Sequence, residues 1–140
     1  LSRMTPKEVV LEASACFDGT IPGIDRYLEY FAEEAVWEFS PSAESPSWLR
    51  IEGKEDARKL YRAVYAARAQ GESATRSVVA EGNTVVVEAS WTSTLTDAAN
   101  GLPAGTRRRF DFVAIYGVAD GLIDSFRQHT GVGVVLGNAG

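Results

Sequence analysis

The sequence contains very few of the residues that build disulfides and metal sites. Its 140 residues include one cysteine, Cys16, and one histidine, His129. A single cysteine excludes an intramolecular disulfide and a cysteine-based metal cluster, and the carboxylates show no metal-ligand spacing. The glycines at 131, 133 and 137 open no helical pattern, so they are not expected to form a phosphate-binding loop. We therefore expect no metal and no cofactor.

Positive charge and long apolar runs are also scarce. The 14 Lys and Arg residues are outnumbered by 19 Asp and Glu residues, which gives a net charge of −5. This balance offers no electrostatic support for nucleic-acid binding. No apolar run approaches the roughly 20 residues of a membrane span, and the first residues show no secretory-signal pattern. The default expectation is a cytoplasmic protein without a nucleic-acid or membrane partner.

What is present is the composition of a globular domain. Hydrophobic residues make up 45% of the chain and charged residues 24%, which is typical of globular proteins with a packed core. The length suits one domain with one core. We therefore predict a single domain over residues 1–140, with residues 1–4 and 131–140 as tails.

Three helices are predicted in the first half of the chain. Thr5-Pro6 has the pattern of an N-cap followed by proline at the first helical position, so a helix is expected over residues 6–17. A second helix is expected within residues 20–31. The clearest helix covers residues 53–70, where apolar side chains recur at helical spacing.

Alternation of apolar and polar residues predicts strands in the remaining segments. The stretch "AVWEFS" is a short early strand, and four further strands follow the third helix. The expected strands cover residues 35–40, 73–80, 84–95, 107–118 and 122–130. Residues 41–52, with two prolines and three serines, are expected to form a loop. The order predicts an α+β domain in which a curved antiparallel sheet folds around helices.

Three stretches of this chain resemble one known superfamily. They are "YFAEEAVWEF" (30–39), "IEGKEDARKLY" (51–61) and "VADGLIDSFRQH" (118–129). Together they are similar to the NTF2-like superfamily, which includes ketosteroid isomerase, limonene epoxide hydrolase and the SnoaL-like polyketide cyclases. The resemblance implies a cone-shaped fold with a deep apolar cavity between the concave sheet face and the helices. It does not determine activity, because this fold hosts enzymes, binding proteins and transport proteins.

The catalytic residues of these relatives have no counterparts here. The resemblance places the catalytic groups of the isomerases at Phe39, near Ala13 and near Ala114. It places the catalytic and water-holding groups of the epoxide hydrolases at Ala89, Trp91, Gln128, Trp37 and Phe39. None of these positions holds the residue type required, so neither activity is transferred to this chain.

Large aromatic side chains occupy the alternate positions of the predicted strands that are expected to face inward. They are Trp37, Phe39, Trp91, Phe110, Phe112 and Phe126, with Tyr116 as a further candidate and Tyr61 and Tyr65 on the inward stripe of the third helix. They form either an ordinary core or the lining of a pocket for a flat or cyclic apolar ligand. Several rings on facing walls are difficult to close-pack, which favours a pocket of roughly a few hundred Å³.

Two candidates for polar chemistry lie on the last predicted strand, on the face of Phe126. Gln128 could orient a ligand but cannot act as a general base. Asp124 could act as a base if the interior raised its pKa; the alternative is an exposed carboxylate beside the hairpin turn.

Two cationic candidates complete the set. His129 is the natural acid–base residue, but alternation places it on the outer face, unless a bulge reverses the parity. Among the three consecutive arginines only Arg108 is expected to face inward, at the cavity rim, with Arg107 and Arg109 facing outward. It is either a clamp for a ligand carboxylate or part of a solvated strand end.

The sequence thus supports two functions of different class. The first is a SnoaL-like or ketosteroid isomerase-like enzyme, of isomerase, cyclase or hydrolase type, that acts on a small apolar, cyclic substrate. The second is a non-catalytic small-molecule-binding protein of the same fold; a protein-interaction module is a third, less favoured class. A homodimer is also predicted, because an apolar patch is expected on the outer sheet face at Val86, Val113, Ile115 and Ile123.

Overall fold

The computed structural model describes residues 4–42, 45–66 and 71–138, and within them three helices and seven strands. The helices are α1 (Pro6–Cys16), α2 (Ile21–Leu28) and α3 (Lys54–Tyr65). The strands are β1 (Phe31–Phe39), β2 (Leu49–Glu52), β3 (Glu72–Glu81), β4 (Thr84–Thr94), β5 (Thr106–Ala119), β6 (Leu122–Thr130) and β7 (Val134–Asn138).

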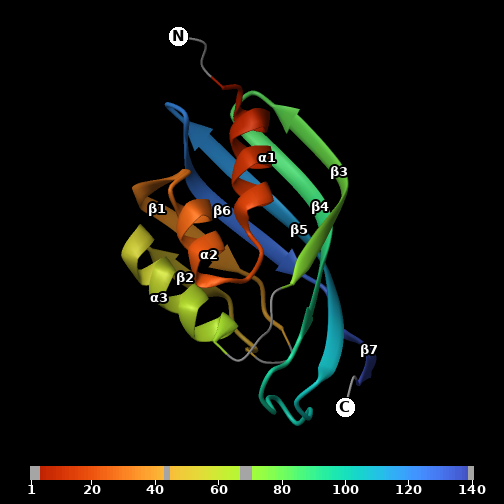
Figure 1. The fold of residues 1–140 in the computed structure, drawn as a ribbon. Helices are drawn as coiled ribbons and strands as arrows, with labels where there is room; N and C mark the ends of the chain where they lie inside the picture. The colour runs from red at the N-terminus through yellow and green to blue at the C-terminus, as the bar shows by residue number, and fades with distance from the viewer. Residues whose placement is uncertain (1–3, 43–44, 67–70, 139–140) are drawn as a thin grey trace.

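One curved sheet wraps around the helices and leaves the fold open at one end (Figure 1). The strand order is β2-β1-β6-β5-β4-β3, and β7 pairs with β5. Strand β1 runs parallel to β6, whereas the other pairs are antiparallel. Helix α1 packs against the strands from β3 to β6, and α3 packs against β1 and β2. The predicted cone-shaped α+β fold is therefore confirmed.

The helix starts follow from local capping chemistry. The Thr5 hydroxyl accepts a hydrogen bond from the Glu8 amide at 3.2 Å, and the Glu8 carboxylate accepts one from the Thr5 amide at 2.8 Å. Thr20 caps α2 by accepting from the Gly23 amide at 3.1 Å. The Thr20 hydroxyl donates to Asp18 Oδ1 at 2.6 Å, which holds the turn between α1 and α2. These caps satisfy amide groups that have no partner within the helix.

Two predicted segments were wrong, and part of a third lies outside the residues that the structure describes. The predicted loop at 41–52 contains β2, whose Leu49 pairs with Phe39. The predicted tail at 131–140 contains β7, whose Val134 pairs with Arg109. Both strands are short and lie beside an existing strand that supplies their hydrogen bonds, so local sequence gave little signal. The predicted extension of the third helix over residues 67–70 lies outside the described residues.

A β-bulge at the start of β6 reverses the sheet faces to which its first side chains were expected to point. Ser125 pairs with Gly117, but Ile123 pairs with Val118, so Asp124 is an extra residue on β6. As a result Ile123 is 0% exposed in the core, whereas Asp124 is exposed. A Cβ built on Gly117 would lie 3.2 Å from Asp124 Oδ1, which places this carboxylate over the outer sheet face. Of the two alternatives for Asp124, the exposed carboxylate beside the hairpin turn is the one observed. The inward position of Asp124 and the outward position predicted for Ile123 are wrong.

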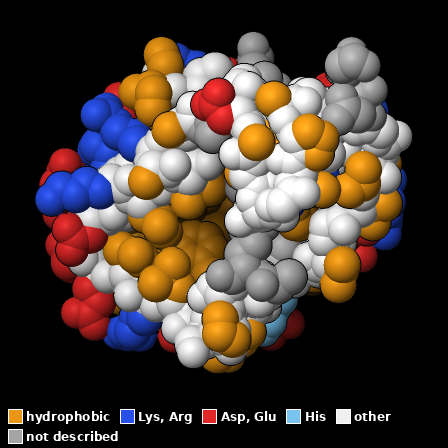
Figure 2. Space-filling model, turned by 90° about the horizontal axis from the view of Figure 1, so that it is seen from below, with side chains coloured by type: hydrophobic (Ala, Val, Ile, Leu, Met, Phe, Trp, Pro, Cys, Tyr) orange, Lys and Arg blue, Asp and Glu red, His pale blue; other side chains and the backbone are white. Residues whose placement is uncertain are grey.

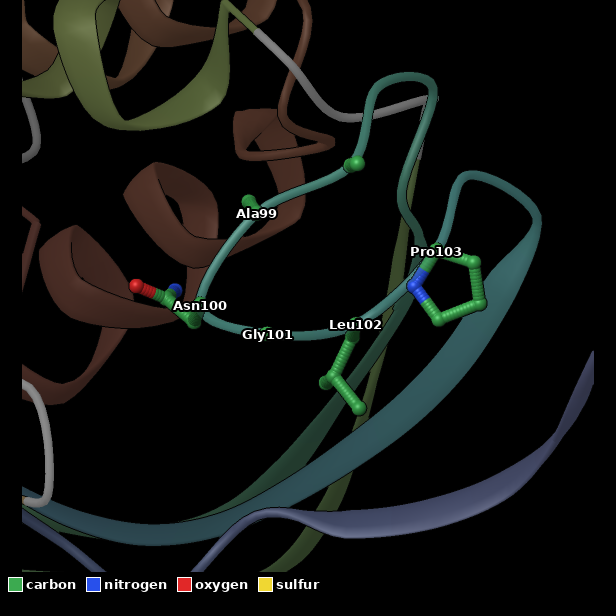
Figure 3. Close-up of a pocket in the computed structure, with 6 residues that line it drawn as sticks. Ala99, Asn100, Gly101, Leu102 and Pro103 are labelled. Atoms are coloured by element: carbon green, nitrogen blue, oxygen red, sulfur yellow. The ribbon is translucent and has the colours of Figure 1, made fainter.

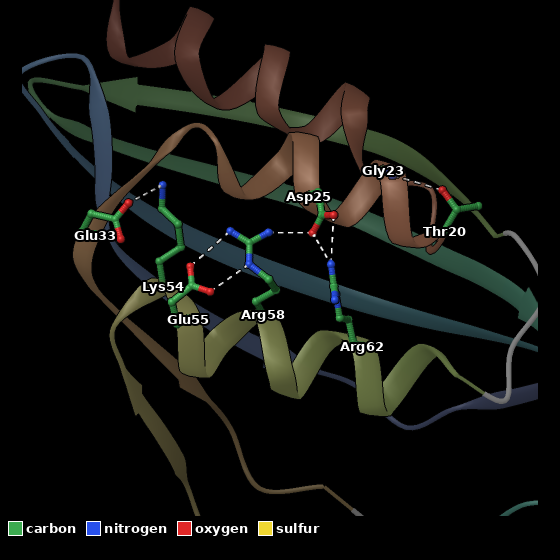
Figure 4. A network of polar contacts seen from close by, with 8 residues as sticks. All are labelled: Thr20, Gly23, Asp25, Glu33, Lys54, Glu55, Arg58 and Arg62. Carbon is green, nitrogen blue, oxygen red and sulfur yellow. Dashed lines mark hydrogen bonds and ion pairs between the residues drawn. The ribbon is translucent and has the colours of Figure 1, made fainter.

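An ion-pair cluster joins α2 to α3 (Figure 4). Arg58 donates to Asp25 Oδ1 at 2.6 Å and Arg62 donates to Asp25 Oδ2 at 3.1 Å. Burial opposes ionisation of Asp25, but the hydrogen bonds and charges of the two arginines outweigh it. The pKa of the Asp25 carboxyl therefore lies below its ordinary value. The folded state thus favours the carboxylate form.

This lowered pKa predicts an acid-dependent contribution to stability. The contribution is present above the ordinary carboxyl pKa and is lost as pH falls through the lowered, folded-state pKa. Because the Asp25 side chain is 37% exposed, solvent screening limits the effect, and Asp25→Asn should cost less than about 1 kcal/mol near neutral pH. The difference in the free energy of unfolding between the wild type and Asp25→Asn, measured with urea, should disappear in strong acid. Asp97→Asn, in the exposed β4–β5 loop, is the control, and an Asp25→Asn effect that is independent of pH would contradict the prediction.

Candidate functional site

The narrow part of the cone is filled by aromatic rings. Phe31 and Trp37 stack with their ring centroids 4.8 Å apart. Phe126 meets the Tyr116 ring edge-to-face at 5.1 Å. These four rings, which we call the deep layer, are all buried. For them the ordinary-core interpretation holds, because close edge-to-face and stacked packing leaves no room for a ligand.

The wide end of the cone is hollow. Figure 2, which views the molecule from this end, shows hydrophobic side chains lining a depression. Several inward positions near it keep partial exposure, although they lie on the concave face of the sheet. A side chain in that position stays accessible only if the space in front of it is open. We call this depression the chamber, and from strand register and partial exposure we infer that it is bordered by Phe39, Tyr65, Phe110, Phe112, Gln128 and Thr130.

Strand register explains why these residues meet. Phe39 pairs with Gln128 across the β1–β6 contact. Phe112 pairs with Thr130 on β6 and with Ala89 on β4. Because paired residues on neighbouring strands point to the same side of a sheet, all of these side chains face the helices. The cavity volume predicted from the sequence stays a prediction.

Two cavities formed by the described residues lie away from the aromatic rings. One, of about 480 Å³, is formed by the bend of the β4–β5 loop at residues 98–103 (Figure 3). The other, of about 280 Å³, lies at the narrow end between Met4, Asn83 and Gly121. The first is formed by one loop alone. Neither brings together the aromatic residues that the sequence singled out.

Phe17 is a contact centre between the helices and the chamber wall. Its ring meets those of Tyr27, Tyr61, Tyr65 and Trp91 edge-to-face, with centroids 5.1 to 5.6 Å apart. The sequence analysis did not assign Phe17 to the site. Phe17 is the C-cap residue that follows α1, and its position becomes evident only where Tyr65 of α3 meets Trp91 of β4 at 5.8 Å.

Buried phenols supply hydrogen-bond donors beneath the chamber. The hydroxyls of Tyr27 and Tyr116 are 3.2 Å apart. Burial raises the pKa of the Tyr27 and Tyr61 phenols well above their ordinary value, and the neighbouring Tyr116 phenol raises both further. Burial also raises the pKa of Tyr116, although hydrogen bonds with Tyr27 and Ser14 lower it in part. These phenols therefore remain protonated near neutral pH and act as donors rather than as bases.

Two buried indole N–H groups have no hydrogen-bond partner among the described residues. They belong to Trp37 and Trp91. The Trp37 N–H lies near the Tyr61 hydroxyl and slightly lowers the pKa of that phenol, but the geometry falls short of a hydrogen bond. Most buried polar groups in proteins have a partner, so each exception calls for an explanation.

Gln128 and Arg108 lie where the sequence predicted. Gln128 is half-buried on the inner face, and its Nε2 donates to Thr130 Oγ1 at 2.9 Å. This bond fixes the orientation of the amide beside the chamber. Arg108 is buried on the inner side of β5, and its guanidinium carbon lies 5.0 Å from the Phe110 ring centroid. A cation over an aromatic face is electrostatically favourable.

Asp124 and His129 lie outside the chamber. Both side chains are exposed. The His129 ring meets the ring of Trp48 at 5.3 Å, and Arg127 lies 5.2 Å from the same ring, on the outer sheet face. The outward position predicted for His129 is confirmed. None of the chamber-lining residues named above is a carboxylate.

The described part of the chain contains neither a metal-ligand cluster nor a membrane-spanning helix. Within residues 4–42, 45–66 and 71–138 there is no group of three His, Cys, Asp or Glu side chains that could hold a metal ion. None of the helices in these ranges is long and apolar enough to cross a bilayer.

The three helices and the curved sheet form an NTF2-like fold. A family model for the SnoaL-like domain matches residues 18–126, so the chain belongs to the SnoaL-like family. No curated protein sequence matches it.

Solved structures show the same fold at low sequence identity. IdmH, a proposed polyketide cyclase from Streptomyces antibioticus, is 17% identical over 91% of this chain and 92% of its own, with a TM-score of 0.73. SalBIII, an epoxide hydrolase/cyclase-like enzyme in pyran ring formation in salinomycin, is 24% identical over 90% of each chain, with a TM-score of 0.68. A ketosteroid isomerase-like protein from Catenulispora acidiphila, in complex with trimethylamine, is 16% identical over 89% of this chain and 85% of its own, with a TM-score of 0.69.

Proposed function

We propose that this SnoaL-like protein is an enzyme of isomerase, cyclase or hydrolase type that acts on a small apolar, cyclic molecule in the chamber. The observation that carries the proposal is the half-buried state of Phe39, Phe110 and Phe112, which face inward at the hollow end of the cone. Flat apolar ligands gain both buried area and ring contacts against such walls. The names of similar structures, a proposed polyketide cyclase and a cyclase-like enzyme, agree with this substrate class.

The chemistry available at the chamber is hydrogen-bond donation. The buried Tyr61 phenol and the Trp91 indole N–H are donors beside the chamber, and the Gln128 amide lies on its wall. Donors aimed at an oxygen that gains negative charge stabilise a transition state without removing a proton themselves. Tyr61 and Tyr65 belong to this set as substrate contacts. Asp124 and His129, as outer-face residues, have no part in the proposed reaction.

A non-catalytic binding protein is the second candidate. It is favoured by one observation, namely that none of the named chamber-lining residues is a carboxylate that could serve as a general base. The two functions share the same chamber and differ only in turnover. Product formation from a bound cyclic substrate distinguishes them.

Gln128→Leu tests the chamber as a binding site. The substitution keeps the side-chain volume but deletes the amide, so affinity for 9-fluorenone, a flat tricyclic ketone, should fall roughly three- to tenfold. Titration of intrinsic tryptophan fluorescence measures it, with thermal unfolding to confirm the fold. Asp124→Asn is the outer-face control and should leave affinity unchanged. Unchanged affinity in Gln128→Leu would make this amide structural, and no binding of the ketone by the wild type would contradict the proposed ligand class.

We also propose a homodimer through the outer sheet face. Val86 pairs with Ile115, and Val113 lies two residues from Ile115 on the same side of the sheet. All three side chains are half-buried in the single chain, and they form a continuous apolar patch. Ile123 does not belong to this patch, because it lies in the core. We expect Val113 and Ile115 at the centre of the contact.

Ile115→Asp should convert the dimer to monomers, because the contact would bury an unpaired charge. Sedimentation velocity measures the change, and Leu11→Asp, on the exposed side of α1, is the control that should stay dimeric. A wild-type protein that sediments as a monomer at micromolar concentration would contradict the proposed dimer.

A further inference from the structure

Trp91 occupies the wall between the chamber and the helices. It lies on β4 directly opposite Phe110 of β5. Its ring meets Tyr65 at 5.8 Å and Phe17 at 5.3 Å. The residue is 6% exposed, and its Nε1 has no hydrogen-bond partner among the described residues. An aromatic side chain with an unpaired polar atom thus lies beside the mainly aromatic lining of the chamber.

Glycine backbone covers the N–H edge of this ring, and none of the described residues accepts a hydrogen bond from it. A Cβ built on Gly71 would lie 2.4 Å from Trp91 Cζ2 and 2.8 Å from Cε2, the carbon bonded to Nε1. A Cβ built on Gly19 would lie 3.1 Å from Cζ2. Two glycines therefore flank this edge, and neither offers a side chain to the N–H. An indole N–H is a donor only, so it stays unpaired until an acceptor arrives from elsewhere.

One further donor lies near Trp91: the buried Tyr61 phenol stays protonated, because burial raises its pKa well above the ordinary value. A ligand that offers an accepting oxygen is better matched to such walls than a hydrocarbon or an ammonium ion. The missing partner of Trp91 and the chemistry of its neighbours therefore favour the same kind of ligand.

We propose that the Trp91 indole N–H donates a hydrogen bond to an oxygen of the chamber ligand, which is therefore an apolar cyclic molecule with an accepting oxygen. This inference rests on the proposed function, since it assigns a ligand group and a donor within the same chamber. Nε1 is covered in the unliganded protein, so the Trp91 ring or its neighbour Tyr65 shifts as the ligand enters.

The other two tryptophans serve as internal references. Trp37 lies in the deep layer, where it is 0% exposed and its N–H is next to the Tyr61 hydroxyl. Trp48 is 47% exposed and lies on the outer face beside His129. The chain has three tryptophans, so a nitrogen-labelled sample gives one indole N–H resonance for each. Only the Trp91 resonance should report directly on a ligand oxygen.

The experiment compares two probes that differ at one carbon. Fluorene and 9-fluorenone have the same flat tricyclic shape, but only fluorenone carries a carbonyl oxygen. Titrated into nitrogen-labelled protein, fluorenone should bind roughly tenfold more tightly than fluorene. It should move the Trp91 indole proton downfield, whereas the Trp37 and Trp48 resonances should show no such displacement. Trp91→Phe, which keeps a ring but deletes the N–H, should remove the preference and retain fluorene binding.

Every other outcome contradicts one part of the proposal: the hydrogen bond, the choice of donor or the ligand class. Equal affinity for the two probes, without a downfield shift at Trp91, overturns the proposed hydrogen bond and leaves the chamber intact as an apolar site. A downfield shift at Trp37 in place of Trp91 overturns the choice of donor. Binding of neither probe overturns the proposed ligand class together with this inference. The wild-type titration needs no substitution, so the test stands even if Trp91→Phe does not fold.

Discussion

Trp37→Ala is expected to destabilise the fold by about 3–5 kcal/mol, the usual cost of deleting a large buried aromatic side chain. Trp37 is 0% exposed and stacks on Phe31 at 4.8 Å. Its pairing with Phe126 on β6 places it where β1 joins the rest of the sheet. The deleted ring would leave a cavity in the deep layer that the neighbouring rigid rings cannot fill. Urea unfolding monitored by circular dichroism measures the loss.

Trp48→Ala is the matched control for the same change of side chain. Trp48 is 47% exposed, and its contacts with His129 and Arg127 lie on the outer face. Its removal should cost less than about 1 kcal/mol, because solvent already reaches much of the ring. Similar costs for the two substitutions would show that the deep layer does not dominate the stability of the fold.

Gly71→Ala is expected to cost about 1–3 kcal/mol by overpacking. The added methyl would lie 2.4 Å from Trp91 Cζ2 and 2.7 Å from the Thr92 carbonyl oxygen. The Gly71 amide donates to the Asp18 carbonyl oxygen at 2.9 Å, which ties the start of β3 to the α1–α2 turn and limits relaxation. Thermal or urea unfolding measures the cost, and fluorescence reports displacement of the Trp91 ring.

A double-mutant cycle with Trp91→Ala separates the two clashes. If the ring is the main obstacle, Gly71→Ala should cost less in the Trp91→Ala background than in the wild type. The same cost in both backgrounds would assign the strain to the Thr92 carbonyl and would contradict the proposed ring contact. The cycle also tests whether Gly71 helps to position a residue of the chamber wall.

Local patterns predicted most of the inner sheet face correctly. Alternation placed Trp37, Trp91, Phe112 and Gln128 on the side that faces the helices, and their strand register agrees. Helix starts were predictable because Thr5 and Thr20 satisfy amide groups only a few residues away. Such features depend on neighbours in sequence, which a single chain displays directly.

The bulge at Asp124 shows where local patterns fail. The residues "LIDSFRQHT" alternate acceptably without it. The extra residue is detectable only from the register between β6 and β5, where Ile123 and Ser125 pair with adjacent residues of β5. Tertiary pairing therefore decided that Ile123 joins the core and that the suspected base lies on the outer face.

The sequence by itself determined the fold class, the inward parity of the aromatic side chains and the absence of the relatives' catalytic residues, because these depend on residue identity and short-range periodicity. Only the tertiary structure decided which rings are close-packed and which stay partly exposed. Trp37 and Phe126 are close-packed, whereas Phe39 and Phe112, which share their parity, remain half-buried. The alternation of residues along a strand determines the sheet face to which each side chain points. The open space in front of that side chain depends on how the sheet curves around the helices.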